Sequence, residues 1–326
     1  MTLHTRFTER FGVEHPVVSA PMDVVSNAGL ATAVSRAGGL GLIGGGYGDE
    51  EWLSRELAAA AGTRVGCGFI TWNIDASFID LALSYEPAAI FLSFGDAGPY
   101  VEQVHRAGVP LICQVHDLAG VDEALRIGAD AVCVQGGEAG GHGRGTRSTF
   151  TLVPEAADLI AEQRPEVLLL AAGGIADGRS LAAALALGAD GVVAGTRFWA
   201  TRQAAVTRAA HARAIATNGD ATRRTGVYDI VRGKNWPPVY TGRVLANDFV
   251  VRWHGHETEL VENLAAARAE FSHAVEADDV DLANMIVGEA VGQVHAIEDA
   301  GDVVRNMAAQ AENILAGGRW QRHHGA

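Results

Sequence analysis

The sequence predicts an α/β fold, a (β/α)8 TIM barrel with a smaller, mainly helical second domain. Short apolar runs alternate with segments whose apolar residues recur at helical spacing, and this alternation implies parallel strands joined by right-handed crossovers. Eight such units suit a closed barrel better than an open doubly wound sheet, although a flavodoxin-like open sheet remains the alternative. The predicted strands are Pro16–Ala20, Leu40–Ile43, Arg64–Ile70, Ala88–Phe94, Pro110–Val115, Ala129–Gln135, Val167–Ala172 and Asp190–Gly195.

A near-repeat at the ends of the predicted helices supports the barrel further. Four predicted helices end in a similar motif with a glycine just past the last helical turn. The motifs are Arg-Ala-Gly-Gly, Arg-Ala-Gly-Val, Arg-Ile-Gly-Ala and Ala-Leu-Gly-Ala, and the glycines are Gly38, Gly108, Gly128 and Gly188. A left-handed cap is needed there, and a strand begins immediately afterwards. Helices are predicted between the strands, among them Asn27–Ala37, Glu50–Ala61, Leu118–Ile127 and Gly178–Leu187.

The pattern changes after the eighth predicted strand. Thr201–Thr217 has helical spacing, Arg223–Val250 is irregular and contains two prolines, and helical patterning returns at Thr258–Glu276 and Ala300–Leu315. We therefore predict a barrel over residues 1–203 and a mainly helical domain over 204–285 that covers one end of it. Residues 286–326 would supply a C-terminal helix that returns to the barrel, followed by a tail.

Composition and charge exclude several classes of partner. The chain has 326 residues, 48% of them hydrophobic, and a formal net charge of −14. Nothing supplies the basic stripe that nucleic acids or anionic membranes require, and no run approaches the ~18 apolar residues of a membrane span. The N-terminus shows no signal peptide, and Cys67, Cys113 and Cys133 lie in separate apolar runs, so we expect buried thiols in a cytoplasmic protein and no metal site.

The sixth predicted strand leads into the most informative loop. The apolar run stops at Gln135 and continues as Gly-Gly-Glu-Ala-Gly-Gly, and His142 follows. The glycines let the backbone approach a ligand closely, and in a barrel the working face lies at the carboxyl ends of the strands. His142 therefore becomes the candidate catalytic residue, although a loop histidine near a tight turn would give the same pattern.

Two further glycine turns predict a phosphate site. Gly173 and Gly174 follow the seventh strand, and Gly195 and Thr196 follow the eighth. Paired turns after these two strands expose backbone N–H groups, which suits a phosphate monoester such as that of FMN or a sugar phosphate. Glycines at ordinary turns between a strand and a helix would produce the same sequence pattern. Asp177 could cap the helix that follows Gly174 without contacting a ligand.

These residues resemble the nitronate monooxygenases, formerly called 2-nitropropane dioxygenases. The resemblance rests on Ala20-Pro21-Met22, the segments 66–72 and 135–142, the run Ala172–Gly178 and Gly195-Thr196-Arg197-Phe198, and it extends over nearly the whole chain. The motifs are less specific within the superfamily, because flavin-dependent enoyl-ACP reductases and NAD(P)H:quinone reductases share much of the pattern.

The resemblance implies a barrel that binds FMN without a covalent bond. His142 would face the substrate above the flavin. The residues implied in cofactor binding are Ala20, Pro21, Met22, Gly68, Gln114, Gln135, Gly136, Gly140, Gly173, Gly174, Gly195 and Thr196. Some relatives have asparagine and lysine where this chain has Gly68 and Gln114, so the contacts at these two positions are in question, and a missing lysine removes a positive charge near the flavin.

Histidine suits oxidation of alkyl nitronates with dioxygen. A neutral imidazole can remove the α-proton of a nitroalkane, and an imidazolium can hold the anionic nitronate. The alternatives are an NAD(P)H-dependent FMN reductase acting on quinones or enoyl thioesters, and a barrel that binds flavin or phosphate without turnover. A homodimer is possible. Further candidates around the site are His116, Phe69, Trp72, Glu138, Lys234, Asn235, Trp236 and Tyr240.

Overall fold

A computed structural model, which describes residues 3–320, contains the predicted barrel. Eight parallel strands run in the order β1-β9-β8-β6-β5-β4-β3-β2, and a parallel bridge between Val18 and Leu40 joins the two ends of the sheet. The barrel prediction is confirmed, and the open-sheet alternative is wrong because its edges would not meet. The strands are β1 Val17–Ser19, β2 Leu42–Gly46, β3 Gly66–Ile70, β4 Ile90–Ser93, β5 Leu111–Val115, β6 Ala131–Gln135, β8 Leu168–Ala172 and β9 Gly191–Ala194.

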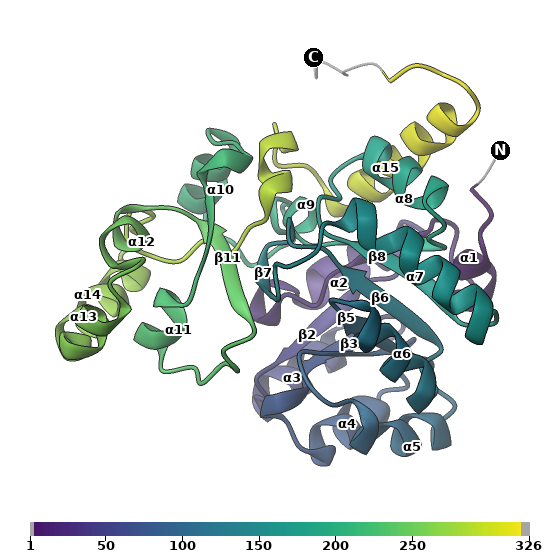
Figure 1. Ribbon diagram of the computed structural model, residues 1–326, viewed down its shortest axis with the longest axis horizontal. Coiled ribbons are helices and arrows are strands. Elements are labelled where there is room, and N and C mark those ends of the chain that lie inside the picture. Colours follow the sequence, from purple (N-terminus) through teal and green to yellow (C-terminus); the bar gives the residue numbers. More distant parts are fainter. Residues whose placement is uncertain (1–2, 321–326) are drawn as a thin grey trace.

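Helices surround this sheet, and the predicted caps are present (Figure 1). Gly38, Gly108, Gly128 and Gly188 all have φ between 69° and 102°, the left-handed conformation that ends a helix before a strand. The C-terminal helix packs against the first and last helices of the ring, α2 and α8. The helices around the barrel are α2 Ala28–Arg36, α3 Glu50–Ala59, α4 Ala76–Leu83, α5 Gly98–Arg106, α6 Leu118–Ile127, α7 Thr149–Gln163, α8 Gly178–Ala186 and α15 Ala300–Leu315.

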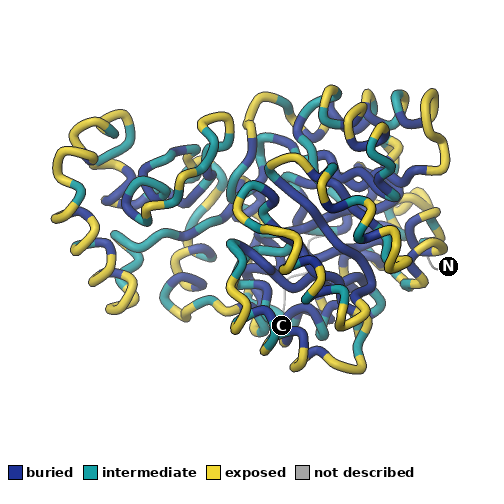
Figure 2. Tube along the Cα trace, turned by 90° about the horizontal axis from the view of Figure 1, so that it is seen from below, coloured by how far each residue is buried: buried dark blue, intermediate teal, exposed yellow. Residues whose placement is uncertain are grey.

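One further helix closes the amino-terminal end of the barrel. Helix α1 (Arg6–Phe11) buries Phe7 and Phe11 in the same apolar cluster as Phe91, and the Arg6 guanidinium forms two hydrogen bonds of 2.8 and 2.7 Å with Asp190. Figure 2 shows the buried strands in the interior. The three cysteines are buried and free, as predicted. With this end filled by side chains, a ligand must enter at the opposite end, where the strands finish.

The segment beyond the barrel differs from its prediction. Residues 223–250, expected to be irregular, contain strands β10 (Thr222–Thr225) and β11 (Thr241–Leu245) and helices α11 (Val227–Arg232) and α12 (Asp248–Trp253). The expected helix over 201–217 starts only at Arg208, as α10 (Arg208–Ile215), and the one over 258–276 is divided into α13 (Glu257–Glu262) and α14 (Leu264–Glu276). The strands were not predicted because each is short, β10 consists only of threonine and arginine, and β11 begins with Thr-Gly-Arg.

The two strands pair with part of the glycine-rich loop that follows β6. Gly141–Gly143 forms strand β7, and the antiparallel order β10-β11-β7 makes a small sheet between the barrel and helices α10–α14 (Figure 1). His142 thus lies on a strand in a defined register, opposite Gly242. Between residues 3 and 320, no helix is long and apolar enough to cross a membrane.

Candidate active site

The strand-end residues predicted from the sequence do come together. A Cβ atom built on Gly195 would lie 3.7 Å from both Ala20 Cβ and Met22 Sδ, so the ends of β1 and β9 touch. A Cβ atom on Gly68 would lie within 2.5 Å of Pro21 Cβ. The backbone at Gly68 is therefore packed directly against Pro21, which leaves no space for a side chain at this position.

Two glutamines at neighbouring strand ends have different environments. Gln135 Oε1 lies 2.9 Å from His116 Nε2, and burial lowers the pKa of His116 to about 4. The neutral ring can therefore donate Nε2–H to the amide oxygen. Gln114 Nε2 is buried and has no partner among the described residues. An orphaned buried donor of this kind is what a carbonyl or ring nitrogen of a bound ligand would satisfy.

The glycine turn after β8 is left-handed and borders open space. Gly173 and Gly174 have φ of 101° and 73°, which an L-residue adopts only under strain. A Cβ on Gly174 would meet nothing closer than 4.0 Å, so its backbone borders open space. Asp177 accepts a 2.9 Å hydrogen bond from Arg179 N and forms a capping box with Ser180. Asp177 therefore caps α8, the role that the sequence analysis considered for it.

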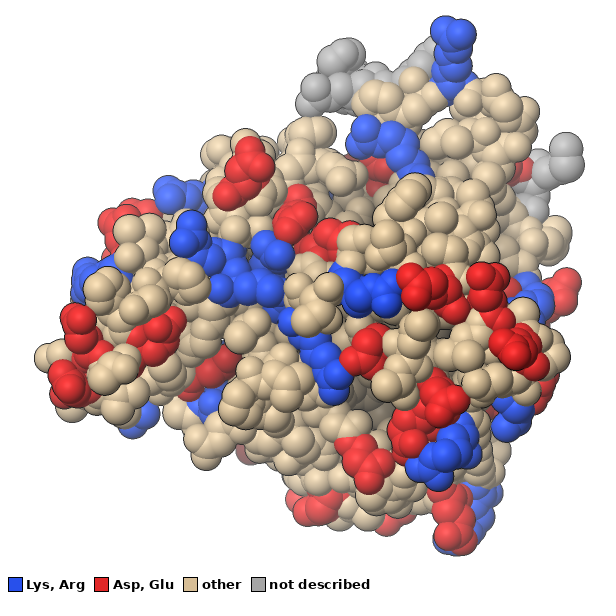
Figure 3. Space-filling model, in the orientation of Figure 1, with Lys and Arg blue, Asp and Glu red and all other residues tan. Residues whose placement is uncertain are grey.

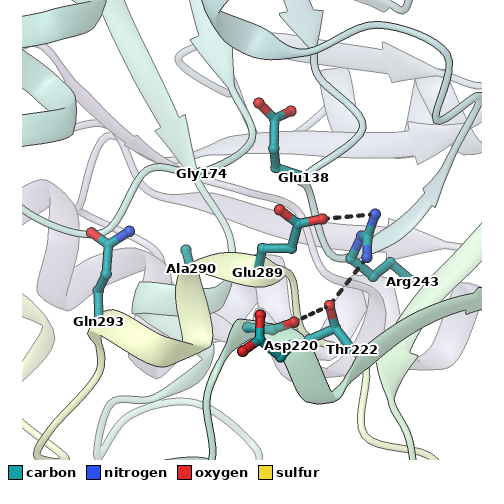
Figure 4. Close-up of a pocket in the computed structure, with 9 residues that line it drawn as sticks. Glu138, Gly174, Asp220, Thr222, Arg243, Glu289, Ala290 and Gln293 are labelled. Carbon is teal, nitrogen blue, oxygen red and sulfur yellow. Dashed lines mark hydrogen bonds and ion pairs between the residues drawn. The ribbon is translucent and has the colours of Figure 1, made fainter.

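A polar pocket of about 590 Å³ opens beside Gly174 (Figure 4). Glu138 and Gly174 line it from the barrel side. Arg243, on β11, lines the other side, with an ion pair of 3.0 Å to Glu289 and a hydrogen bond of 3.1 Å to Thr222 Oγ1. None of these residues was predicted to belong to the site. Arg243 lies in the segment expected to be irregular, and Thr222 and Glu289 lie between the stretches for which helices were predicted.

The small sheet separates two groups of functional side chains. Its register places Arg224 opposite Arg243 on one face and Thr225, Gly242 and His142 on the other. Burial, followed by the charge of Arg243, lowers the pKa of Arg224 to about 10. Figure 3 shows basic side chains gathered near the middle of this view, where Figure 1 places β11. The cationic face therefore borders the polar pocket, and the histidine face turns elsewhere.

His142 is held by two residues that the sequence analysis did not pair with it. Its Nε2 lies 3.0 Å from both carboxylate oxygens of Asp229, and its ring stacks on Trp236 with centroids 3.5 Å apart and planes 5° apart. The side chains of His142 and Asp229 are only 10% and 13% exposed. Asp229 lies on α11, 87 residues further along the chain, and no local motif signals the contact.

Aromatic rings enclose the other sides of His142. Phe94, at the end of β4, lies edge-on at 6.4 Å and also contacts Trp236 and Tyr240. Trp236 donates a 2.9 Å hydrogen bond from Nε1 to the Tyr47 hydroxyl, and burial raises the pKa of Tyr47 to about 12. Two of the candidates around the site, Trp236 and Tyr240, belong to this group of rings, and a third, Lys234, lies 3.9 Å over the Tyr47 ring. The enclosure keeps bulk water from the imidazole.

Other predicted residues have structural contacts. Phe69 belongs to the apolar core rather than to this enclosure. Both carboxylate oxygens of Glu138 accept from Thr149 N at 3.0 and 3.1 Å, so this side chain orders the loop that leads to His142. A Cβ on Gly136 would collide with Thr149, and one on Gly140 with the backbone of Gly288. Among the described residues, no group of three or more potential ligands could hold a metal ion.

Comparison with known proteins finds relatives that cover most of this chain. The family model for nitronate monooxygenase matches residues 4–64 and 58–310. A nitronate monooxygenase, npaC, of Metarhizium robertsii is 34% identical over 92% of this chain and 91% of its own length. An octahydroindene-carboxyl-CoA dehydrogenase of Mycobacterium tuberculosis is 33% identical over 68% of this chain and 63% of its own. The solved structure of FabK from Thermotoga maritima superimposes with a TM-score of 0.84 at 27% identity, covering 97% of this chain and 98% of that one.

Proposed function

This chain belongs to the nitronate monooxygenase family of oxidoreductases, and on that premise we propose that it uses FMN to oxidise alkyl nitronates with dioxygen. The observation that carries the proposal is the position of His142. Its imidazole is nearly buried, paired with Asp229 and surrounded by aromatic rings at the carboxyl ends of the barrel strands. Such a site can bind a small organic anion and handle one proton.

The residues at the strand ends fit a flavin mononucleotide. Gln114 would donate its unpartnered Nε2–H to the ring system, with Ala20, Pro21 and Met22 beneath it. The left-handed turn at Gly173 and Gly174 would turn backbone N–H groups toward the phosphate, together with Gly195 and Thr196. When bound, the flavin supplies the electron transfer to dioxygen.

The protein's own contribution is to bind and orient the substrate. With a neutral nitroalkane, an unprotonated nitrogen of His142 accepts the α-proton, and the electron pair of the C–H bond moves into the nitro group. With a preformed nitronate, the protonated ring donates a charge-assisted hydrogen bond to a nitronate oxygen. Trp236 and Phe94 exclude water from the same space.

The second candidate function is an NAD(P)H-dependent FMN reductase that acts on quinones or enoyl thioesters. The identity of 33% with a dehydrogenase named for a CoA thioester favours it. The polar pocket beside Gly174 would then receive part of a larger substrate. The third candidate is a barrel that binds flavin or phosphate and catalyses no reaction.

Oxygen uptake distinguishes these candidates. With the purified, FMN-loaded protein in air, we expect rapid oxygen consumption after addition of an alkyl nitronate and only slow consumption with NADH or NADPH. The reverse order of rates, with a quinone or an enoyl thioester accelerating NAD(P)H oxidation, would establish the reductase. Absence of turnover with every substrate would leave a flavin-binding barrel.

A further inference from the structure

We propose that Asp229 is a positioning residue that fixes which nitrogen of His142 meets the substrate. In this arrangement, Nε2–H of His142 is committed to the Asp229 carboxylate, and Nδ1 is the nitrogen that exchanges a proton or donates a hydrogen bond at the reacting centre. The chemical role given to Nδ1 rests on the proposed function. The contact between His142 and Asp229 is a feature of the structure and does not depend on that function.

The contact between the two side chains determines the proton position. An ionised carboxylate can only accept, and Nε2 lies 3.0 Å from both Asp229 oxygens, so Nε2 must carry the hydrogen. The carboxylate oxygens of Asp229 have no other partner among the described residues, and both side chains are almost buried. In such surroundings a carboxylate–imidazole hydrogen bond is stronger than in water.

The orientation of the ring is fixed as well as its tautomer. Trp236 covers one face of the imidazole at 3.5 Å, and strand β7 holds the backbone of His142 opposite Gly242. Nδ1 has no hydrogen-bond partner among the described residues. The nitrogen left for chemistry is therefore Nδ1, with its lone pair when the ring is neutral.

The proton transfer balances with these groups alone. The α-C–H bond of a nitroalkane breaks, an Nδ1–H bond forms, and the electron pair is delocalised onto the nitro oxygens of the resulting nitronate. The new imidazolium is compensated by the adjacent Asp229 charge. Without the carboxylate, no acceptor holds the hydrogen on Nε2, and a larger share of neutral rings carries it on Nδ1, where the ring cannot accept the substrate proton.

The variant Asp229→Asn tests this role in the FMN-loaded protein. The tautomer of His142 is measured directly by ¹⁵N NMR, with the His142 signals assigned by their loss in His142→Asn. We expect a single Nε2–H tautomer in the unmodified protein and a mixture or the Nδ1–H form in Asp229→Asn. Turnover of a neutral nitroalkane should fall on the order of 10²–10⁴-fold, whereas turnover of the preformed nitronate should fall less than about tenfold. The variant Asp229→Glu should recover part of the nitroalkane activity.

A surface pair provides the matched control. His256 Nδ1 lies 3.1 Å from Glu259 Oε1, and the two side chains are 58% and 64% exposed. The variant Glu259→Gln replaces the carboxylate beside His256 by an amide, as Asp229→Asn does beside His142. We expect its turnover of both substrates to equal that of the unmodified protein.

Two results would overturn the proposal. One is an unchanged His142 tautomer in Asp229→Asn, and the other is an equal loss of nitroalkane and nitronate turnover, which indicates a purely structural role. Failure of the proposed function is separate, because the unmodified protein would then oxidise neither substrate while the NMR measurement still decides the tautomer.

Discussion

Replacement of His142 by asparagine is expected to lower turnover of neutral nitroalkanes on the order of 10²–10⁴-fold, and turnover of preformed alkyl nitronates less, while the protein keeps its FMN. Asparagine keeps a polar amide at this position but has no group that titrates near neutral pH. Since the ring lies on β7 and its contacts are with Asp229, Trp236 and Phe94, the fold of the barrel does not depend on it. Steady-state rates and the visible absorbance of the bound flavin are the measurements.

The control for this variant is His256→Asn, which changes an exposed histidine directly before helix α13. Its rates should equal those of the unmodified protein. A His142→Asn protein that binds FMN and retains full turnover would remove the histidine from the chemistry and favour an activity in which the flavin alone reacts with the substrate.

Replacement of Gly68 by alanine is expected to destabilise the fold by about 1–3 kcal/mol and to weaken FMN binding. The added methyl group would overlap Pro21, with Cβ–Cβ only 2.5 Å, in the place where Pro21 is expected to lie under the flavin. Proline cannot move without its backbone, so the whole Ala20-Pro21-Met22 turn must shift. Chemical denaturation and titration of the apoprotein with FMN measure the two effects.

Gly226 is the matched control for that substitution. Its φ is −104°, and a Cβ there would meet no atom within 4 Å. We expect Gly226→Ala to cost no more than about 1 kcal/mol and to leave the affinity for FMN unchanged. Equal stability and equal FMN affinity in the two variants would mean that Pro21 does not approach Gly68 as the structure has it.

The barrel could be predicted because its signals are local. Each strand is a run of apolar residues buried on both faces, and each cap is a glycine at a fixed place after a helix, as at Gly128 with φ of 89°. Helix α1 escaped prediction because its six residues are too few to display periodicity. Its role depends on Phe7 and Phe11 entering the barrel interior, a tertiary contact.

The candidate site was predictable only in part, for the same reason. His142 and the glycines at the strand ends stand in recognisable motifs, and the barrel topology brings them to one end. Asp229 and Trp236 reach His142 only through the pairing of β7 with β11, whose five residues TGRVL resemble an ordinary loop segment. Arg243 faces the polar pocket for the same reason. These contacts depend on long-range register, which the spacing of residues along the chain does not encode.

The central claim is that the bound flavin takes its electrons from a nitronate, and an anaerobic reaction tests it most directly. The visible spectrum of the purified protein is recorded first, and separate samples are then mixed without oxygen with an alkyl nitronate, NADH and NADPH. We predict flavin absorption that is bleached by the nitronate and is unchanged on the same timescale by either pyridine nucleotide. Absence of flavin absorption, or rapid bleaching by NADH or NADPH alone, would contradict the account, and the latter result would identify the reductase.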